Sequence, residues 1–216
     1  MNDIQLGRLF GFPVTLQPSA LAILAFFVLS GARNGAHSAY YSFMLTLVIF
    51  ASIMVHELGH AFVARAYGLG PIAITLHGFG GLTRFTQAPQ PKQGIFITLA
   101  GPIAGFLLGL LALVGTFFIQ TPVVGSLLAT ATTFNLFWSA FNLLPMYPLD
   151  GGIVTYHGLS LWKRPEIALL WAARLGVLVA VGVGTAAAVR GEIFIGIIAL
   201  MSLARSVPIV MATSKA

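Results

Sequence analysis

The chain has 216 residues, of which 58% are hydrophobic and only 7% are charged, and its mean hydropathy is +0.95. Soluble domains carry about 25% charged residues, so this composition excludes an ordinary soluble protein and indicates a polytopic membrane protein. The formal net charge of +6 comes from basic residues scattered between apolar segments, which favours membrane orientation over nucleic-acid binding. The absence of cysteine excludes disulfides and thiolate metal ligands.

We expect one all-α membrane domain over residues 1–216, with six transmembrane helices. Residues 1–13 form an amphipathic segment in which Phe10 and Phe12 are interfacial anchors, and Asp3 stands too early for a cleavable signal peptide. A span needs about 20 apolar residues to cross a hydrocarbon core of about 30 Å. The predicted spans cover about residues 14–30, 40–66, 94–119, 123–144, 166–189 and 192–211.

The second span carries the sequence His56-Glu57-Leu58-Gly59-His60. Residues four apart lie on one face of a helix, so both imidazoles can reach one metal ion, and Glu57 can reach the water in its open position. Zinc lowers the pKa of such a water to about 7, and the carboxylate then acts as general base. Ionisable side chains within a span indicate a functional site. The alternative is a histidine pair hydrogen-bonded within the bundle, with Glu57 as its partner.

A small β-hairpin is predicted after the second span, over residues 72–85. Apolar and other residues alternate there, and Gly78-Phe79-Gly80-Gly81 forms the turn. The edge of this hairpin, at Ile72–Leu76, is expected to be exposed.

The third and fourth spans contain signals for close packing and for a break. Gly101, Gly105 and Gly109 recur every four residues, a small-residue stripe that lets another helix approach closely. The fourth span ends in Pro145–Gly152, where two prolines and two glycines predict a broken, extended segment. Irregular backbone at membrane depth must be packed in protein or line a cavity.

A catalytic zinc takes three protein ligands and keeps one open position, so a third ligand is needed. Asp150 is carried by the broken segment, whereas Asp3, Glu166 and Glu192 stand at span ends or on the surface. The alternative for Asp150 is an Asp-Gly turn at the membrane interface. His77 and His157 are weaker candidates. An exposed position on the hairpin explains His77 better, and a position at the membrane interface explains His157 better.

Together the motifs resemble the site-2 protease family of intramembrane zinc metalloproteases. The resemblance rests on His56–His60, on Ala100-Gly101-Pro102 and on Asn142–Gly152, and it covers roughly residues 10–210. The chain resembles the compact six-span members of the family, since neither a PDZ insertion nor a nucleotide-sensing domain is visible. The family often has Asn where Gly105 stands, which places a polar role at that position in question.

The resemblance implies a role for each matching residue. His56, His60 and Asp150 are expected to bind one Zn²⁺ per chain, and Glu57 is expected to activate water. Asn142 is expected to steady the carbonyl or oxyanion of the scissile peptide. The hairpin edge is expected to hold an unwound substrate as an added strand, through the residues Ile72, Ala73, Ile74, Thr75 and Leu76.

The expected function is therefore that of an intramembrane zinc endopeptidase, which cleaves within or next to the transmembrane segment of a single-span membrane protein. Its other partner is the lipid bilayer, and nucleic acid is not expected. A membrane metal transporter is one alternative, but it needs further carboxylates or histidines along a path. A catalytically inactive substrate-binding relative is the other, and the intact Glu57 with its ligand set argues against it.

The basic residues predict the orientation in the membrane. With six spans, the termini share one side with the links after spans two and four, and that side collects Arg8, Arg84, Lys92, Lys163, Arg164 and Lys215. The opposite side has only Arg33 and Arg190. The positive-inside rule then places both termini in the cytosol, with the active site toward that side of a prokaryotic cell membrane.

Overall fold

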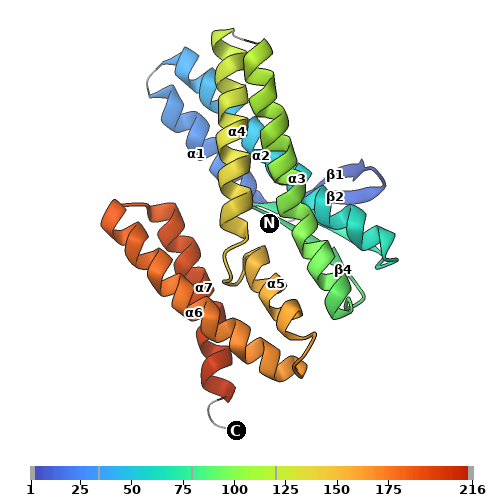
Figure 1. The fold of residues 1–216 in the computed structure, drawn as a ribbon. Coiled ribbons are helices and arrows are strands. Elements are labelled where there is room, and N and C mark those ends of the chain that lie inside the picture. Colours follow the sequence, from blue (N-terminus) through green and yellow to red (C-terminus); the bar gives the residue numbers. More distant parts are fainter. Residues whose placement is uncertain (1–2, 34, 79, 120, 214–216) are drawn as a thin grey trace. The chain divides into compact units, whose positions relative to one another are not determined.

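The computed structural model describes residues 3–33, 35–78, 80–119 and 121–213, so Phe79 of the hairpin turn and Lys215 lie outside the described residues. The chain forms two compact units, described separately below (Figure 1). Unit 1 comprises residues 1–88 and 100–139, and unit 2 comprises residues 89–99 and 140–216. The elements are β1 (Ile4–Leu9), β2 (Phe12–Leu16), α1 (Pro18–Ala32), α2 (Ala36–Ala66), β3 (Ile72–His77), β4 (Gly80–Phe85), α3 (Pro91–Phe118), α4 (Pro122–Asn142), α5 (Asp150–Leu159), α6 (Pro165–Arg190) and α7 (Ile193–Thr213).

Within the described residues, five helices are long and apolar enough to cross a membrane: α2, α3, α4, α6 and α7. This is an integral membrane protein, as the composition predicts. The predicted first span differs, because Val14–Leu16 belongs to a strand and the helix begins only at Pro18, whose fixed φ suits a first helical turn. Helix α1 has 15 residues, about 22 Å at 1.5 Å per residue, which is shorter than a core of about 30 Å.

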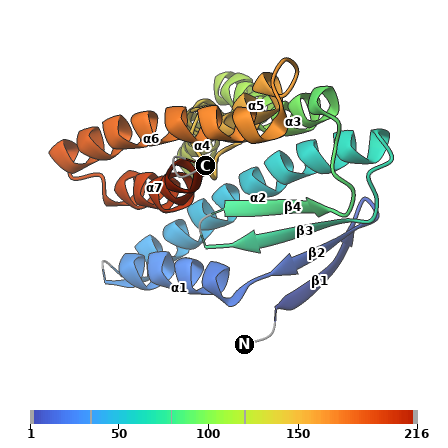
Figure 2. The same cartoon turned by 90° about the horizontal axis from the view of Figure 1, so that it is seen from below.

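The N-terminal residues form two strands of a four-stranded sheet with the order β1-β2-β3-β4 (Figure 2). Strand β2 pairs in parallel with β3, so that Val14 lies opposite Ile74, and β4 pairs antiparallel with β3 on the other side. The expectation of an exposed edge at Ile72–Leu76 is therefore wrong. Strand β3 is an interior strand because a segment some 60 residues earlier covers it, and β4 is the edge.

The sheet also corrects the prediction of two interfacial anchors. Phe12 is buried, whereas Phe10 is 63% exposed at the turn between β1 and β2. The Phe10 carbonyl accepts a hydrogen bond of 2.9 Å from Nη1 of Arg65, and the guanidinium of Arg65 lies over the rings of Phe12 and Phe62. Arg65 thereby ties the N-terminal hairpin to the end of α2.

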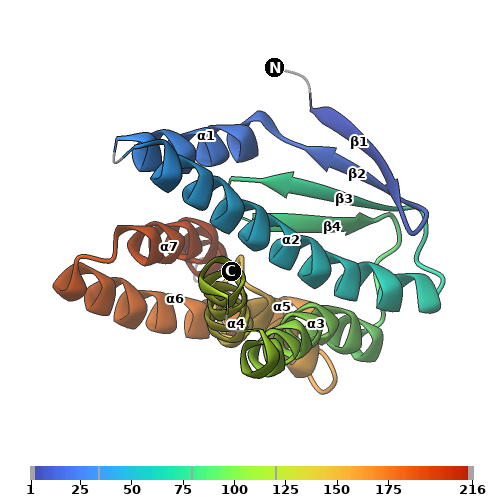
Figure 3. The same cartoon turned by 90° about the horizontal axis from the view of Figure 1, so that it is seen from above.

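Helix α2 packs against α1, β3 and β4, all within unit 1 (Figure 3). The prediction that the glycine stripe permits close helix packing is confirmed in the same unit. A Cβ on Gly59 of α2 would lie 2.8 Å from the carbonyl carbon of Ala100, and one on Gly109 would lie 3.1 Å from Cβ of Asn135 in α4. Helix α3 therefore lies between two helices whose surfaces approach it more closely than larger residues would allow.

In unit 2, α6 and α7 pack side by side and α5 packs against α6 (Figure 3). Gly191 ends α6 with a φ of +72°, a left-handed conformation that favours glycine. The predicted break after α4 is present, with turns up to Leu149. However, Asp150–Gly152 is not extended but begins α5. Gly151 has no room for a side chain because its α-carbon faces the carbonyls of Leu143 and Leu144.

Candidate metal centre

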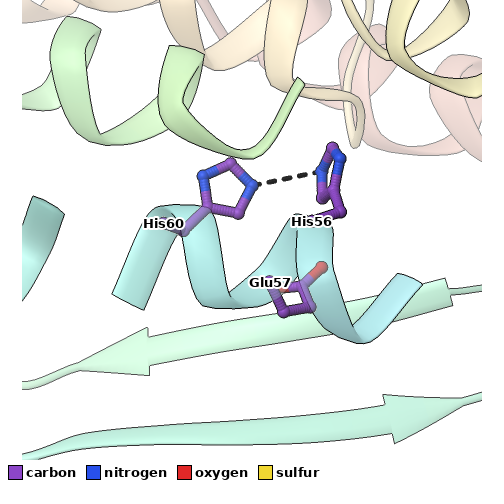
Figure 4. A group of neighbouring side chains, drawn as sticks. All are labelled: His56, Glu57 and His60. Atoms are coloured by element: carbon purple, nitrogen blue, oxygen red, sulfur yellow. Dashed lines mark hydrogen bonds between the residues drawn. The ribbon is translucent and has the colours of Figure 1, made fainter. Parts of the chain in front are cut away.

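His56 and His60 lie on one face of α2 with their Nε2 atoms 3.2 Å apart, and both side chains are buried (Figure 4). Two imidazoles on a tetrahedral zinc with bonds of 2.0–2.1 Å have nitrogens about 3.3 Å apart. The observed separation, which is also that of a hydrogen bond between the rings, fits that value, so the geometry suits the binding of one ion. The sequence prediction that the two histidines converge is correct.

Glu57 belongs to the same buried group, in which one donor atom from each of His56, Glu57 and His60 lies within 4.8 Å of the others. Its side chain points toward the sheet, whereas both imidazoles rise from the other side of the helix (Figure 4). The Oε2 atom of Glu57 accepts a hydrogen bond of 2.7 Å from the hydroxyl of Thr83 on β4. The carboxylate is thus held beside the histidine pair by the edge strand.

Helix α3 forms the wall of the site next to the imidazoles. A Cβ on Gly101 would lie 2.8 Å from Cδ2 of His60 and closer still to two other ring atoms. A Cβ on Gly105 would lie 2.6 Å from Oγ of Ser139 and 3.7 Å from Nδ1 of His56. Glycine at both positions therefore leaves the space that the imidazole rings and a polar side chain from α4 occupy.

Polar residues of α4 gather behind His56, and sequence reasoning missed them. Nδ2 of Asn135 donates to Oγ of Ser52 at 2.8 Å and to the carbonyl of Ala131 at 2.7 Å. Its Oδ1 would lie 3.8 Å from a Cβ on Gly105, near the buried hydroxyl of Ser139. The neighbouring helix thus places an amide and a hydroxyl beside Gly105. The four-residue spacing of Asn135 and Ser139 in an apolar span is the signal that could have found them.

Asp150 and Asn142 belong to unit 2. Asp150 is the first residue of α5, and Asn142 is the buried last residue of α4. Leu149 precedes Asp150 in an extended conformation as the N-terminal cap of α5. Carboxylates are favourable in the first turn of a helix. The roles of Asp150 as third ligand and Asn142 as carbonyl partner stay predictions.

The two weaker histidine candidates are both half-buried. Burial lowers the pKa of His77, although the Glu57 carboxylate and a backbone hydrogen bond with Gly81 raise it and Arg84 lowers it. The charge of Glu57 therefore acts on His77 within unit 1. His157 packs against Gly94 within unit 2, and burial lowers its pKa.

The sequence and the fold match known metalloproteases. Peptidase family M50 matches residues 44–127, which include the histidine pair. Rip3 of Mycobacterium tuberculosis is 36% identical over 91% of this chain and 55% of its own length. A zinc metalloprotease of Methanocaldococcus jannaschii is 32% identical over 69% of this chain and 43% of its own length. The chain thus spans about half the length of these curated relatives.

A solved structure extends the similarity to nearly the whole fold. The site-2 protease from Methanocaldococcus jannaschii superposes with a TM-score of 0.71 at 25% sequence identity, covering 97% of this chain and 95% of that protein. The residues of this chain fit zinc by their spacing and donor types, and relatives of similar sequence are named zinc metalloproteases. The chain belongs to Peptidase family M50, the site-2 protease family.

Proposed function

We propose that this protein is an intramembrane zinc endopeptidase that hydrolyses a peptide bond within or next to the transmembrane segment of a single-span membrane protein. The observation that carries the proposal is the buried histidine pair, 3.2 Å apart, with a buried carboxylate beside it on a helix long enough to span a membrane. Such a group is expensive within a membrane and indicates function.

Each side chain has a distinct task. His56 and His60 hold the ion from α2, and Asp150 from α5 contributes the third ligand and a negative charge. When bound, zinc supplies Lewis-acid charge that polarises a carbonyl and acidifies water. Glu57 takes the proton of the attacking water and delivers it to the leaving nitrogen. The amide of Asn142 donates to the carbonyl oxygen of the scissile peptide, where negative charge develops.

The substrate must lose its helical hydrogen bonds, because a fully bonded helix hides its carbonyls from attack. Strand β4 is the edge of the sheet next to Glu57, so β4 rather than β3 is the strand to which an unwound peptide adds. Main-chain hydrogen bonds to β4 replace the helical hydrogen bonds that the substrate loses when it unwinds. Side chains beside the pairing strand then select among substrates.

The protein acts in the bilayer of a prokaryotic cell membrane, since the relatives described above are bacterial and archaeal. In this proposal α1 makes the sixth crossing despite its length, with local thinning of the bilayer beside it. Both termini and the active-site side of the membrane are then cytosolic, as the distribution of basic residues indicates.

The test is cleavage in proteoliposomes with a panel of purified single-span proteins. Wild-type protein loaded with zinc is expected to cut a member of the panel, and mass spectrometry is expected to place the cut within or next to the transmembrane segment. Chelation should abolish the cut and zinc should restore it. Cuts confined to soluble loops far from the membrane would contradict the proposal.

A further inference from the structure

We propose that Thr83 of β4 is a positioning residue for the general base, so that the strand receiving the substrate also holds Glu57 in place. The inference rests on the proposed function, because it assigns Thr83 to the same reaction. The hydroxyl of Thr83 lies 2.7 Å from Oε2 of Glu57 and 3.0 Å from its backbone carbonyl oxygen. These contacts join residues that are 26 positions apart in the chain.

The two contacts suit a residue that must gain and lose a proton. A threonine hydroxyl has one proton to donate and can also accept. While Glu57 is a carboxylate, the hydroxyl donates to Oε2 in a charge-assisted bond. After the other carboxyl oxygen of Glu57 has taken the proton of water, Oε2 still accepts from the Thr83 hydroxyl, and the new O–H passes its proton to the leaving nitrogen. The carboxyl group therefore keeps a partner in the same place through both halves of the reaction.

The neighbouring glycine makes this contact possible. A Cβ on Gly81 would lie 2.6 Å from the carboxyl carbon of Glu57, so the backbone of β4 lies directly against the side chain. Thr83 and Gly81 are two residues apart, and alternate residues of a strand share one face. One face of β4 thus packs against the side chain of Glu57. Thr83 contributes its hydroxyl to this contact, and Gly81 contributes only backbone atoms.

This arrangement couples substrate pairing to catalysis. Strand β4 has one neighbour in the described sheet, β3, and an edge strand is held less firmly than an interior one. A peptide that pairs with the outer edge of β4 reduces the motion of the strand. Through the hydrogen bond from Thr83, the Glu57 carboxylate is then also held more firmly in position. The placement of the base is then part of substrate recognition.

The experiment compares Thr83→Val, which removes only the hydroxyl at similar volume, with Thr83→Ser, which restores it. Thr15→Val is the matched control, because Thr15 bonds to Thr75 in the same sheet and lies on β2, two strands away from β4. Thr83→Val should keep its zinc and its KM but lose about 10- to 100-fold in kcat, the effect of a lost hydrogen bond to a charged group. Thr83→Ser should recover most of the rate. If Thr83→Val does not fold, Thr83→Ala takes its place because it adds no bulk.

A second measurement does not depend on cleavage. The chain has only five acidic residues, so the infrared carboxyl band of Glu57 in the metal-free protein can be identified by subtraction of Glu57→Gln. The band should shift in Thr83→Val, return in Thr83→Ser and stay unchanged in Thr15→Val. An unshifted band, or an unchanged kcat in Thr83→Val, overturns the inference. Absence of cleavage by the wild type overturns the proposed function instead, while the band still decides whether Thr83 holds Glu57.

Discussion

Gly101→Ala should weaken zinc binding although alanine favours the helix. A Cβ at this position would lie 2.8 Å from Cδ2 of His60, whereas ordinary contacts begin at 3.4 Å. The ring must therefore recede by at least about 0.6 Å, three times the tolerance of about 0.2 Å on a metal–ligand distance. Because the obstructing atoms are the end of a flexible side chain, the fold can accommodate the change. The helix itself gains up to about 1 kcal/mol from the replacement of glycine.

The assay is competition of the purified protein with a zinc chelator, with circular dichroism as a check on folding. The expected result is native helix content with zinc affinity reduced by about 10- to 100-fold or more. Loss of a group that supports a metal ligand costs that much, and in the proposed site His60 is itself a ligand. Gly115→Ala is the control on the same helix. Its Cβ would be 3.3 Å from the flexible end of Leu128, and it should bind zinc normally. Wild-type affinity in Gly101→Ala would refute the assignment of His60.

Asp150→Ala should lower zinc occupancy, whereas Glu166→Ala should not, because the exposed Glu166 pairs with Arg164 at the start of α6; full zinc in purified Asp150→Ala would show that another residue is the third ligand. Single cysteines placed in this cysteine-free chain should react from the cytosol at Lys163 and from outside at Gly35, and the reverse pattern would overturn the topology. Burial lowers the pKa of His157 from 6.5, so the folded state binds this proton less readily than the unfolded chain. Stability should therefore fall as the pH drops below 6.5, and the fall measured by thermal melting between about pH 7.5 and pH 5 should be smaller in His157→Gln.

Local patterns predicted the convergence of His56 and His60 because helical geometry alone brings them together. The same holds for the glycine stripe, whose four-residue period is a property of one helix. The paired segments Ile72–His77 and Gly80–Phe85 also lie where alternation of side chains indicates a hairpin. In each case the residues that form the pattern are close in sequence.

The errors in the first span and at the hairpin edge involve contacts between distant segments. Val14 and Leu16 are apolar and stand just before the apolar α1, so their hydropathy alone does not distinguish a strand from the start of a span. The pairing of this segment with β1 and with residues 74–76 defines it as β2, and the pairing with residues 74–76 makes β3 an interior strand. Thr83 gives no signal in the sequence, because its contact with Glu57 depends on the helix packed against the strand.

Zinc retention and cleavage by Glu57→Gln, measured on one reconstituted sample, test the central claim most directly. In the proposed mechanism the histidine pair binds the ion and Glu57 moves the proton, so the variant should hold as much zinc as the wild type. Its cleavage rate on the same single-span substrate should fall by about 10²–10⁴-fold, the usual contribution of a general base. A zinc-replete Glu57→Gln protein that cleaves at the wild-type rate would contradict the account.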